Sequence, residues 1–271
     1  MHAGPVAPMR SSSSFEKRGQ HMIFMLSDYG LGGPYVGQVE AVIALTAPGE
    51  DRFSLFHDLP PFRADLAAHL LPAYSSDSKP KGSIFLCVVD PGIGGSRRAV
   101  ALEADGRWYV GPDNGLFAIV ARRAKSTCWW VVTVPGQAAS ASFHGRDIFA
   151  PVAAMIARGE MPAAELAEAS SAGDEWPNDL AKIVYEDRFG NLMTGIRAAM
   201  LGPRNNLTLN GRTLDRATTF SDVGPGEAFW SENGNGLAEI AVNQGSASVE
   251  FNARVGDAVD VLQRGGMDAG E

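Results

Sequence analysis

SIFLCVVDPGIGGSRR, residues 83–98, is an apolar run that ends at a carboxylate, a glycine-rich turn and two arginines. The run over 83–89 predicts a strand that is buried on both faces. Asp90 follows at the C-terminal end of that strand, and the glycines behind it let the backbone turn sharply and approach a ligand closely. Arg97 and Arg98 return to the same edge, which is where open α/β sheets bind their ligands. This stretch predicts a ligand site, although taken alone a strand-end turn with a surface ion pair explains it equally well.

A second acidic strand end precedes this stretch in the chain. MIFMLS, residues 22–27, predicts another buried strand, which ends at Asp28 and a run of glycines. Pro34 suits the first turn of a helix predicted over 35–46, whose valines and isoleucine share one face. A strand, an acidic turn and a helix in this order are typical of nucleotide-binding folds, but an aspartate before a helix is more often a cap. The other strand ends are needed to distinguish a nucleotide-binding turn from a helix cap.

Two further strand ends repeat the pattern. The short strand in FSLFHDLPPF leads to a rigid Pro-Pro pair that presents Phe62, an aromatic that either lies against a sugar or base or packs into the protein. A β-hairpin predicted over 99–112 ends in Asp113 and Asn114. Four strand ends with acidic or amide side chains favour one ligand-binding edge over a set of unrelated turns.

One histidine stands at a predicted helix entrance. The segment SFHGRDIFAPVAAMIARGE predicts a helix over 148–158 with Asp147 as its N-cap, and Gly145 frees the turn that places His144 just ahead of it. Most lone histidines are structural or exposed. Because this helix entrance is expected near the strand ends, His144 is the candidate for chemistry among the five histidines.

The composition limits the possible partners. Hydrophobic residues make up 45% of the 271 residues and charged residues 20%, as in an ordinary globular protein. The net charge of -8 and the isoelectric point near 5.2 leave no basic stripe for phosphates, so we expect no nucleic-acid partner. No apolar run is long enough for a bilayer, so we expect no membrane partner. Cys87 and Cys128 are expected as core residues without disulfide or metal, which fits a cytoplasmic location.

The pattern of residues divides the chain into segments. Residues 1–21, with four consecutive serines, predict a disordered leader or a wrongly assigned start, and not a signal peptide. Residues 22–175 alternate strands with helices and predict an N-terminal α/β/α sheet domain. A loop-rich stretch over 170–180 marks the boundary. Residues 180–265 predict a C-terminal all-β domain of short strands, either barrel-like or sandwich-like, and SVEF over 248–251 is one of these strands.

A loop of the C-terminal domain carries residues of a different kind. EDRFGNL, residues 186–192, places Phe189 and Asn191 on either side of a glycine. An aromatic suits the face of a flat heteroaromatic ligand and an amide suits its edge. From composition alone, a turn next to a core phenylalanine explains the same residues equally well.

Seven motifs in order resemble the S-adenosyl-L-methionine (SAM) hydroxide adenosyltransferases: LSDYGLGGPYVG, HDLPPF, VVDPGIGGSRR, VGPDNGL, FHGRDIFAPVAA, EDRFGNLMT and LAEIAVNQGSA. These adenosine-forming SAM hydrolases are relatives of the bacterial fluorinase and chlorinase. The resemblance runs from about Met22 to Leu262 and implies an N-terminal α/β domain and a C-terminal β-barrel domain. It also implies a homotrimer that holds SAM between the N-terminal domain of one subunit and the C-terminal domain of its neighbour. The implied reaction is hydrolysis of SAM to adenosine and L-methionine by an activated water that attacks ribose C5', without a metal or other cofactor.

The resemblance also assigns roles to single positions. The family's hydrolases handle the attacking water with an Asp, an Arg and a His, and these positions are filled here by Asp90, Arg97 and His144. Asp28 matches the carboxylate that holds the ribose hydroxyls, and Phe62 matches an aromatic beside the sugar. The C-terminal loop that contacts the methionine amine and the adenine corresponds to Asp187, Phe189 and Asn191.

Two positions depart from the family's pattern. Gly33 stands where an aspartate is common, and Gly234 stands where a serine near the methionine carboxylate is usual, so the resemblance is weakest at the amino-acid end of SAM. A halogenase of the same superfamily stays an alternative, although those enzymes lack the Asp, Arg and His set. A SAM or adenosine binding protein without turnover is a second alternative. A Rossmann methyltransferase is disfavoured because no GxGxG follows the first strand.

Overall fold

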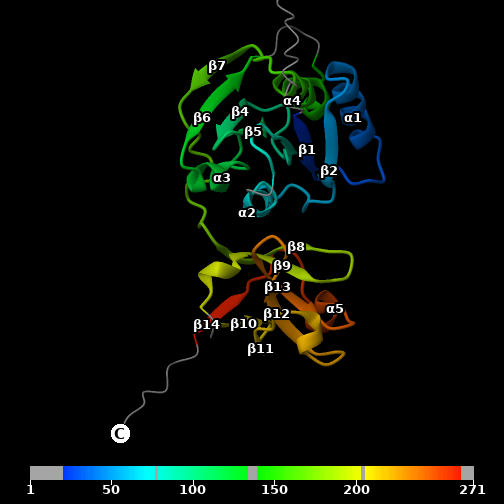
Figure 1. Ribbon diagram of the computed structural model, residues 1–271, viewed down its shortest axis with the longest axis vertical. Coiled ribbons are helices and arrows are strands. Elements are labelled where there is room, and N and C mark those ends of the chain that lie inside the picture. Colours follow the sequence, from blue (N-terminus) through cyan, green and yellow to red (C-terminus); the bar gives the residue numbers. More distant parts are fainter. Residues whose placement is uncertain (1–20, 77–78, 134–138, 203–204, 264–271) are drawn as a thin grey trace, which may run out of the picture.

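The computed structural model describes residues 21–76, 79–133, 139–202 and 205–263 and shows two domains joined end to end (Figure 1). The N-terminal domain occupies the upper half of the view and the C-terminal domain the lower half. The strands are β1 (Met22–Ser27), β2 (Asp51–Phe56), β3 (Ile84–Val88), β4 (Ala99–Ala104), β5 (Arg107–Pro112), β6 (Thr127–Val132), β7 (Ala164–Ala167), β8 (Leu180–Glu186), β9 (Leu192–Arg197), β10 (Asn205–Leu209), β11 (Arg212–Leu214), β12 (Ala228–Glu232), β13 (Leu237–Val242) and β14 (Asp260–Gln263). The α-helices are α1 (Tyr35–Thr46), α2 (Ala64–Tyr74), α3 (Ala118–Arg123), α4 (Ala150–Ala157) and α5 (Ala247–Phe251).

The order of the N-terminal sheet places the ends of β1 and β3 next to one another. The sheet runs β2-β1-β3-β5-β4-β6-β7, with parallel pairs from β2 to β5 and antiparallel pairs from there to β7. The chain leaves β1 through α1 to β2 on one side and returns through α2 to β3 on the other side. Ser27 pairs with Val88, so Asp28 and Asp90 emerge at one edge. Open α/β sheets bind ligands at such a reversal of strand order.

Helices cover both faces of this sheet, as predicted. One core contains residues of α1 and α4 together with Ile84, Leu86 and Val88, and the other contains residues of α2 and α3 together with Phe85 and Cys87. Each residue of β3 is at most 4% exposed, which explains why the apolar run is continuous and does not alternate with polar residues. Burial of each large side chain contributes about 1.5–3 kcal/mol to the stability of the folded state. The buried strand β3 therefore fixes the position of the residues that follow it.

Two predictions about local structure were wrong. The helix predicted from residue 148 begins earlier, with a π-helical turn over Gly145–Phe149 that leads directly into α4, and Asp147 is not its cap. The strand predicted over 248–251 is instead α5, because the Ser246 side chain caps the helix by accepting from the Val249 amide at 3.2 Å.

The ends of the chain lie largely outside the described residues. The predicted leader, 1–21, is outside them apart from His21, whose ring donates to the Gly82 carbonyl at 3.0 Å. His21 therefore belongs to the folded domain. Among the described segments, every helix is too short or too polar to span a lipid bilayer.

The C-terminal domain is all-β in its sheets, as predicted, but a closed barrel is not confirmed. Its strands form a three-stranded sheet, β11-β10-β14, and a four-stranded sheet, β12-β13-β9-β8. Two isolated bridges, Lys182 with Ala258 and Arg216 with Trp230, link segments at the edges of these sheets. Their shared core includes Ile183, which is fully buried.

The two domains share hydrophobic and polar contacts. Val184 and Leu237 of the C-terminal domain belong to the same core cluster as Phe85 of β3. At the edge of this interface the Tyr185 hydroxyl donates to Asp58 Oδ2 at 2.9 Å. The domains are therefore packed against one another and not merely tethered.

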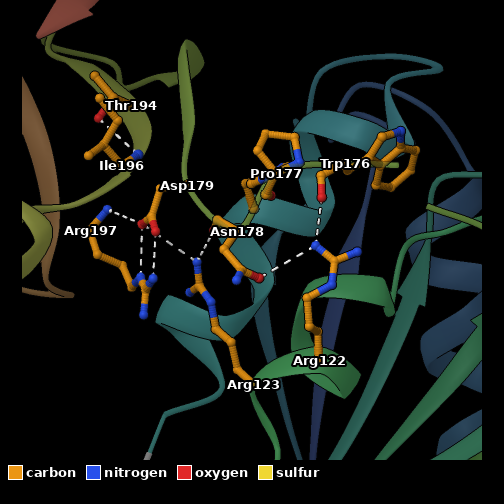
Figure 2. A network of polar contacts seen from close by, with 10 residues as sticks. Arg122, Arg123, Trp176, Pro177, Asn178, Asp179, Thr194, Ile196 and Arg197 are labelled. Carbon is orange, nitrogen blue, oxygen red and sulfur yellow. Dashed lines mark hydrogen bonds and ion pairs between the residues drawn. The ribbon is translucent and has the colours of Figure 1, made fainter. Parts of the chain in front are cut away.

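A polar network fastens the segment between the domains (Figure 2). Arg122 of α3 donates to the Trp176 carbonyl at 2.6 Å, and Arg123 lies 3.8 Å from the Asp179 carboxylate. Asp179 also accepts from Arg197 of β9 at 2.8 Å through Nε and at 3.0 Å through the backbone amide. Burial alone would raise the pKa of Asp179, but the hydrogen bonds from Arg197 outweigh it and the pKa is lowered. Asp179 is thus a charged link between α3 and β9.

Candidate functional site

Asp90, Arg97 and His144 contact one another at the C-terminal edge of the sheet. The Arg97 guanidinium donates through Nε to Asp90 Oδ1 at 3.0 Å and through Nη2 to Asp90 Oδ2. The same Nη2 lies 2.6 Å from His144 Nδ1. The side chains of Asp90 and Arg97 are 4% and 12% exposed, and the guanidinium lies over the ring of Phe149. This is a bidentate contact with a carboxylate, shielded from solvent. The planar guanidinium can make such a contact and a lysine ammonium cannot.

The contact with Arg97 defines the protonation state of His144. A guanidinium has only donors, so Nδ1 accepts from Arg97 and the ring proton is on Nε2. Burial lowers the pKa of His144 below its ordinary value of 6.5, and the charge of Arg97 lowers it further, while Asp90 and Asp147 act in the opposite direction. At neutral pH His144 is therefore uncharged and offers Nε2–H as a donor.

Asp28 and Phe62 form a second contact at this edge. The Phe62 amide donates to Asp28 Oδ2 at 3.0 Å. Phe62 follows two prolines in a turn closed by a bond from the Arg63 amide to the Pro60 carbonyl at 3.2 Å, and it has a positive φ of 64°. Its side chain is 73% exposed. Burial raises the pKa of Asp28, the Phe62 amide lowers it in part, and the charge of Asp90 raises it further.

Tyr29 forms a wall beside these residues. Its ring meets those of Tyr35 and Phe143, with centroids 5.7 Å and 5.9 Å away. Its hydroxyl fills the space beside Gly145, where a Cβ would lie 1.8 Å from it. Burial raises the pKa of Tyr29 above its ordinary value, and the charges of two nearby carboxylates add to this, so the phenol stays protonated. The glycine next to His144 is therefore required by this close approach.

The predicted loop of the C-terminal domain is organised by Asp187. Its Oδ1 accepts from the amides of Phe189 and Asn191 at 2.8 Å and 2.9 Å, and its Oδ2 accepts from Asn191 Nδ2 at 2.9 Å. Gly190 has a φ of 81° and no room for a side chain, because Ser246 Oγ would lie 2.1 Å from its Cβ. Phe189 is 67% exposed and Asn191 is 8% exposed.

These loop residues line a cavity of about 560 Å³. The cavity walls are Asp187, Phe189, Asn191, Phe220, Val242, Gln244 and Gly245. An exposed aromatic ring, an anchored amide and apolar walls together suit a flat heteroaromatic group. Phe189 is therefore exposed to solvent beside this cavity, and it is not the core phenylalanine that composition alone would equally have allowed.

The predicted site residues fall into two groups. The N-terminal group is Asp28, Phe62, Asp90, Arg97 and His144, and the C-terminal group is Asp187, Phe189 and Asn191. In the described residues, no hydrogen bond or ion pair joins one group to the other. The described residues also hold no cluster of three histidine, cysteine or acidic side chains that could bind a metal.

The sequence did not single out several residues of these walls. Tyr29 lies in the first strand-end motif and Gln244 in the last motif, so closer attention to these stretches would have found both. Phe220 and Val242 line the cavity without any local pattern that marks them. What the N-terminal group offers chemically is an acidic, half-buried edge that can hold and orient a water molecule between carboxylates and the His144 donor.

Family models match most of the chain. Residues 23–167 match the SAM hydroxide adenosyltransferase N-terminal domain, and residues 181–260 match the SAM hydroxide adenosyltransferase C-terminal domain. Among similar proteins is the (R)-S-adenosyl-L-methionine hydrolase of Thermus thermophilus, which is 39% identical over 89% of this chain and 99% of its own length. A protein of the same name from Salinispora tropica is 33% identical over 88% of this chain and 97% of its own.

Solved structures resemble the whole chain as well. An uncharacterized conserved protein from Thermotoga maritima gives a TM-score of 0.80 at 29% identity, over 89% of this chain and all of that chain. A conserved hypothetical protein from Thermus thermophilus gives a TM-score of 0.71 at 33% identity, with the same coverage.

Proposed function

Because this chain belongs to the SAM hydroxide adenosyltransferase family, we propose that it hydrolyses SAM to adenosine and L-methionine by attack of water on ribose C5'. The observation that carries this proposal is the contact among Asp90, Arg97 and His144 beside Asp28. The similar proteins are named (R)-S-adenosyl-L-methionine hydrolases, so we include the (R)-sulfonium epimer as a substrate. Their names also favour hydrolysis over halogenation.

The proposed reaction needs little activation at the carbon. The water oxygen forms a bond to C5' while the C5'–S bond breaks. The electron pair of the broken C5'–S bond stays on sulfur and gives the neutral thioether of methionine. One water proton leaves, and adenosine keeps the other on its 5'-hydroxyl. Since the sulfonium is already an excellent leaving group, the protein has to place the water in line and accept its proton, and the reaction calls for no metal or other cofactor.

Each residue of the N-terminal group has a role in this proposal. Asp90 accepts the water proton or a hydrogen bond from the water through the lone pairs that Arg97 leaves free. Arg97 fixes Asp90 and favours the developing hydroxide by its charge. His144 orients the water through Nε2–H. Because an anion-like nucleophile meets a cation, charge is neutralised in the transition state and a closed, dry site favours the reaction.

The remaining predicted residues would bind SAM. Asp28 would accept from the ribose hydroxyls, and the exposed ring of Phe62 would lie against the sugar. Adenine and the methionine amine would occupy the C-terminal cavity, where they meet Asp187, Phe189 and Asn191. At the amino-acid end, a Cβ on Gly234 would meet nothing within 4 Å, so this position leaves open space where the family usually places a serine.

We further propose a homotrimer in which SAM lies between residues 22–175 of one subunit and residues 180–265 of its neighbour. The separation of the site residues into two groups and the exposure of Phe62 (73%) and Phe189 (67%) support this arrangement, since both rings need a partner surface. The cysteines are free, which supports a cytoplasmic location.

Incubation with SAM epimers tests the proposed function. In oxygen-18 water we expect adenosine that carries the heavy label at the 5'-hydroxyl and methionine that carries none. Asp90→Ala should cut turnover roughly 100-fold or more with little change in SAM affinity. A product that requires chloride would point to a halogenase, and tight binding of SAM without release of methionine would point to a binding protein.

A further inference from the structure

The motif at the end of β5 has no role in the proposed reaction, yet it contacts the loop that carries Asp90 and Arg97. Asn114 Nδ2 donates to the Val89 carbonyl at 2.8 Å, one residue before Asp90. Asn114 Oδ1 in turn accepts from the Leu116 amide at 3.3 Å, which fixes the orientation of the side-chain amide. Val89 is fully buried, so its carbonyl depends on a protein donor.

Asp113 holds the other end of the same loop. Its Oδ2 accepts from Arg98 Nε at 2.7 Å, and its backbone amide donates to the Arg98 carbonyl at 3.0 Å. The Asp113 side chain is 8% exposed. Asp113 and Asn114, which follow β5, therefore hold the two ends of the loop 90–97 in place.

The hydrogen bonds of Asp113 and Asn114 begin where the pairing of β3 with β5 ends. The parallel pairing of β3 with β5 stops at Leu86 and Val110. Beyond that point the strands approach so closely that a Cβ on Gly111 would lie 2.2 Å from the Cys87 carbonyl oxygen. Residues 91–96 are exposed, so they offer few contacts that could fix the ends of the loop.

From this geometry we propose that Asp113 and Asn114 are positioning residues, which hold Asp90 and Arg97 at the spacing that their contact with His144 requires. The inference rests on the proposed hydrolysis for its kinetic consequence, but the contacts themselves do not depend on it. Loss of a positioning contact moves reacting groups by fractions of an ångström to an ångström, and an error of that size costs up to about 100-fold in rate.

Two variants of Asn114 separate the donor from the shape of the side chain. Asn114→Ala removes the amide, and Asn114→Asp keeps the shape but replaces the donor by an oxygen that repels the Val89 carbonyl. We expect both to lower kcat for SAM roughly 10-fold to 100-fold while KM changes less than about 3-fold. Asn206→Ala serves as the control, because the Asn206 amide likewise donates one hydrogen bond, to Asp215 Oδ1 at 2.8 Å, but lies in β10 of the other domain. Its kcat should equal that of the parent protein.

The titration of His144 gives a readout that a merely structural role would not move. The charged groups that face its ring are Arg97, Asp90 and Asp147. If the loop loosens, the charge of Arg97 moves away and the pKa of His144 rises toward 6.5, which NMR of the ring protons detects after assignment with His144→Gln. Asp113→Asn, which keeps a neutral acceptor for Arg98, should give a smaller change in the same direction and replaces the Asn114 variants if they do not fold.

The outcomes are distinct. Reduced kcat together with a raised pKa of His144 supports the positioning role. Variants of Asn114 that keep the parent kcat within about 3-fold and leave the His144 titration unchanged overturn it. If the parent protein forms no adenosine from SAM, the proposed function fails, and the His144 titration alone still decides whether Asn114 and Asp113 position Arg97.

Discussion

At the residue scale, Arg97 contacts Asp90 and His144 at the same time. The Arg97 guanidinium donates one hydrogen bond to each carboxylate oxygen of Asp90, and its Nη2 also donates to Nδ1 of His144. Protonation of His144 would place a proton where Arg97 already donates one and would set two cations against each other. The intact arrangement therefore requires neutral His144.

This requirement predicts how activity depends on pH. The pKa of His144 is lowered by burial and by Arg97, so the neutral form persists below the ordinary value of 6.5. We expect kcat/KM for SAM to be constant around neutral pH and to fall as the pH drops through an inflection below 6.5. His144→Gln, whose amide oxygen can still accept from Arg97, should be slower but should lack this inflection. An inflection above 6.5 in the parent protein, or one that survives in His144→Gln, would contradict the assignment.

At the element scale, the turn that follows β2 is strained at Phe62. Phe62 occupies the left-handed region, with a φ of 64°, at the third position of a turn where glycine is usual. Such a conformation costs about 1 kcal/mol for a residue with a side chain. The strain is consistent with an aromatic that is held for a ligand and not for the core.

Phe62→Gly should therefore change stability and binding in opposite directions. Relief of the strain should raise the free energy of unfolding by up to about 1 kcal/mol, while loss of the ring should weaken SAM binding several-fold or more. Phe62→Leu is the control, since it keeps the strain and loses the aromatic face, so binding should weaken with no gain in stability. Urea unfolding and calorimetric titration measure the two effects. A less stable Phe62→Gly protein would show that the turn is not strained.

How much the sequence could predict depends on the range of the interactions. β1 and α1 were predicted with the observed bounds, because a buried apolar run and a one-sided apolar face are local patterns. α5 was missed because its signal is a capping serine on a segment that is only five residues long. The contact of Asn114 with Val89 depends on the placement of β5 beside β3, which no local pattern reveals. Strand ends and loops indicated most of the site residues, the family's motifs assigned their roles, and their division into two groups needed the structure.

At the scale of the whole molecule, the network around Asp179 should stabilise the packing of the domains (Figure 2). The pKa of Asp179 is lowered, so its contribution is present above the unfolded-state value of 3.8 and is lost as the pH falls through the folded-state pKa. We expect Asp179→Asn to lower the free energy of unfolding by about 1–2 kcal/mol at pH 7, after allowance for partial solvent screening. Glu250→Gln, which removes an exposed pair with Arg212, should cost less than about 0.5 kcal/mol. Equal stability of Asp179→Asn and the parent protein would show that the network contributes nothing.

The assembly decides whether the two groups of site residues meet within one chain or between chains. Within one chain the domains are packed through a shared core, so a large closing motion between them would have to break contacts such as that of Tyr185 with Asp58. A neighbouring subunit that brings its Phe189 to the exposed Phe62 avoids this cost. Light scattering should then give three times the chain mass of 28.7 kDa.

Complementation between two inactive variants tests this arrangement directly. Asp90→Asn damages only the N-terminal group, and the double variant Phe189→Ala with Asn191→Ala damages only the C-terminal group. In co-expressed mixed trimers a shared site is intact when the double variant supplies its N-terminal group and Asp90→Asn supplies its C-terminal group, so about a quarter of the sites should recover SAM hydrolysis. If each site lies within one chain, every site carries a damaged half and the mixture stays as slow as the better of the two variants. The recovered activity, measured as adenosine released per chain, therefore separates a shared site from an internal one.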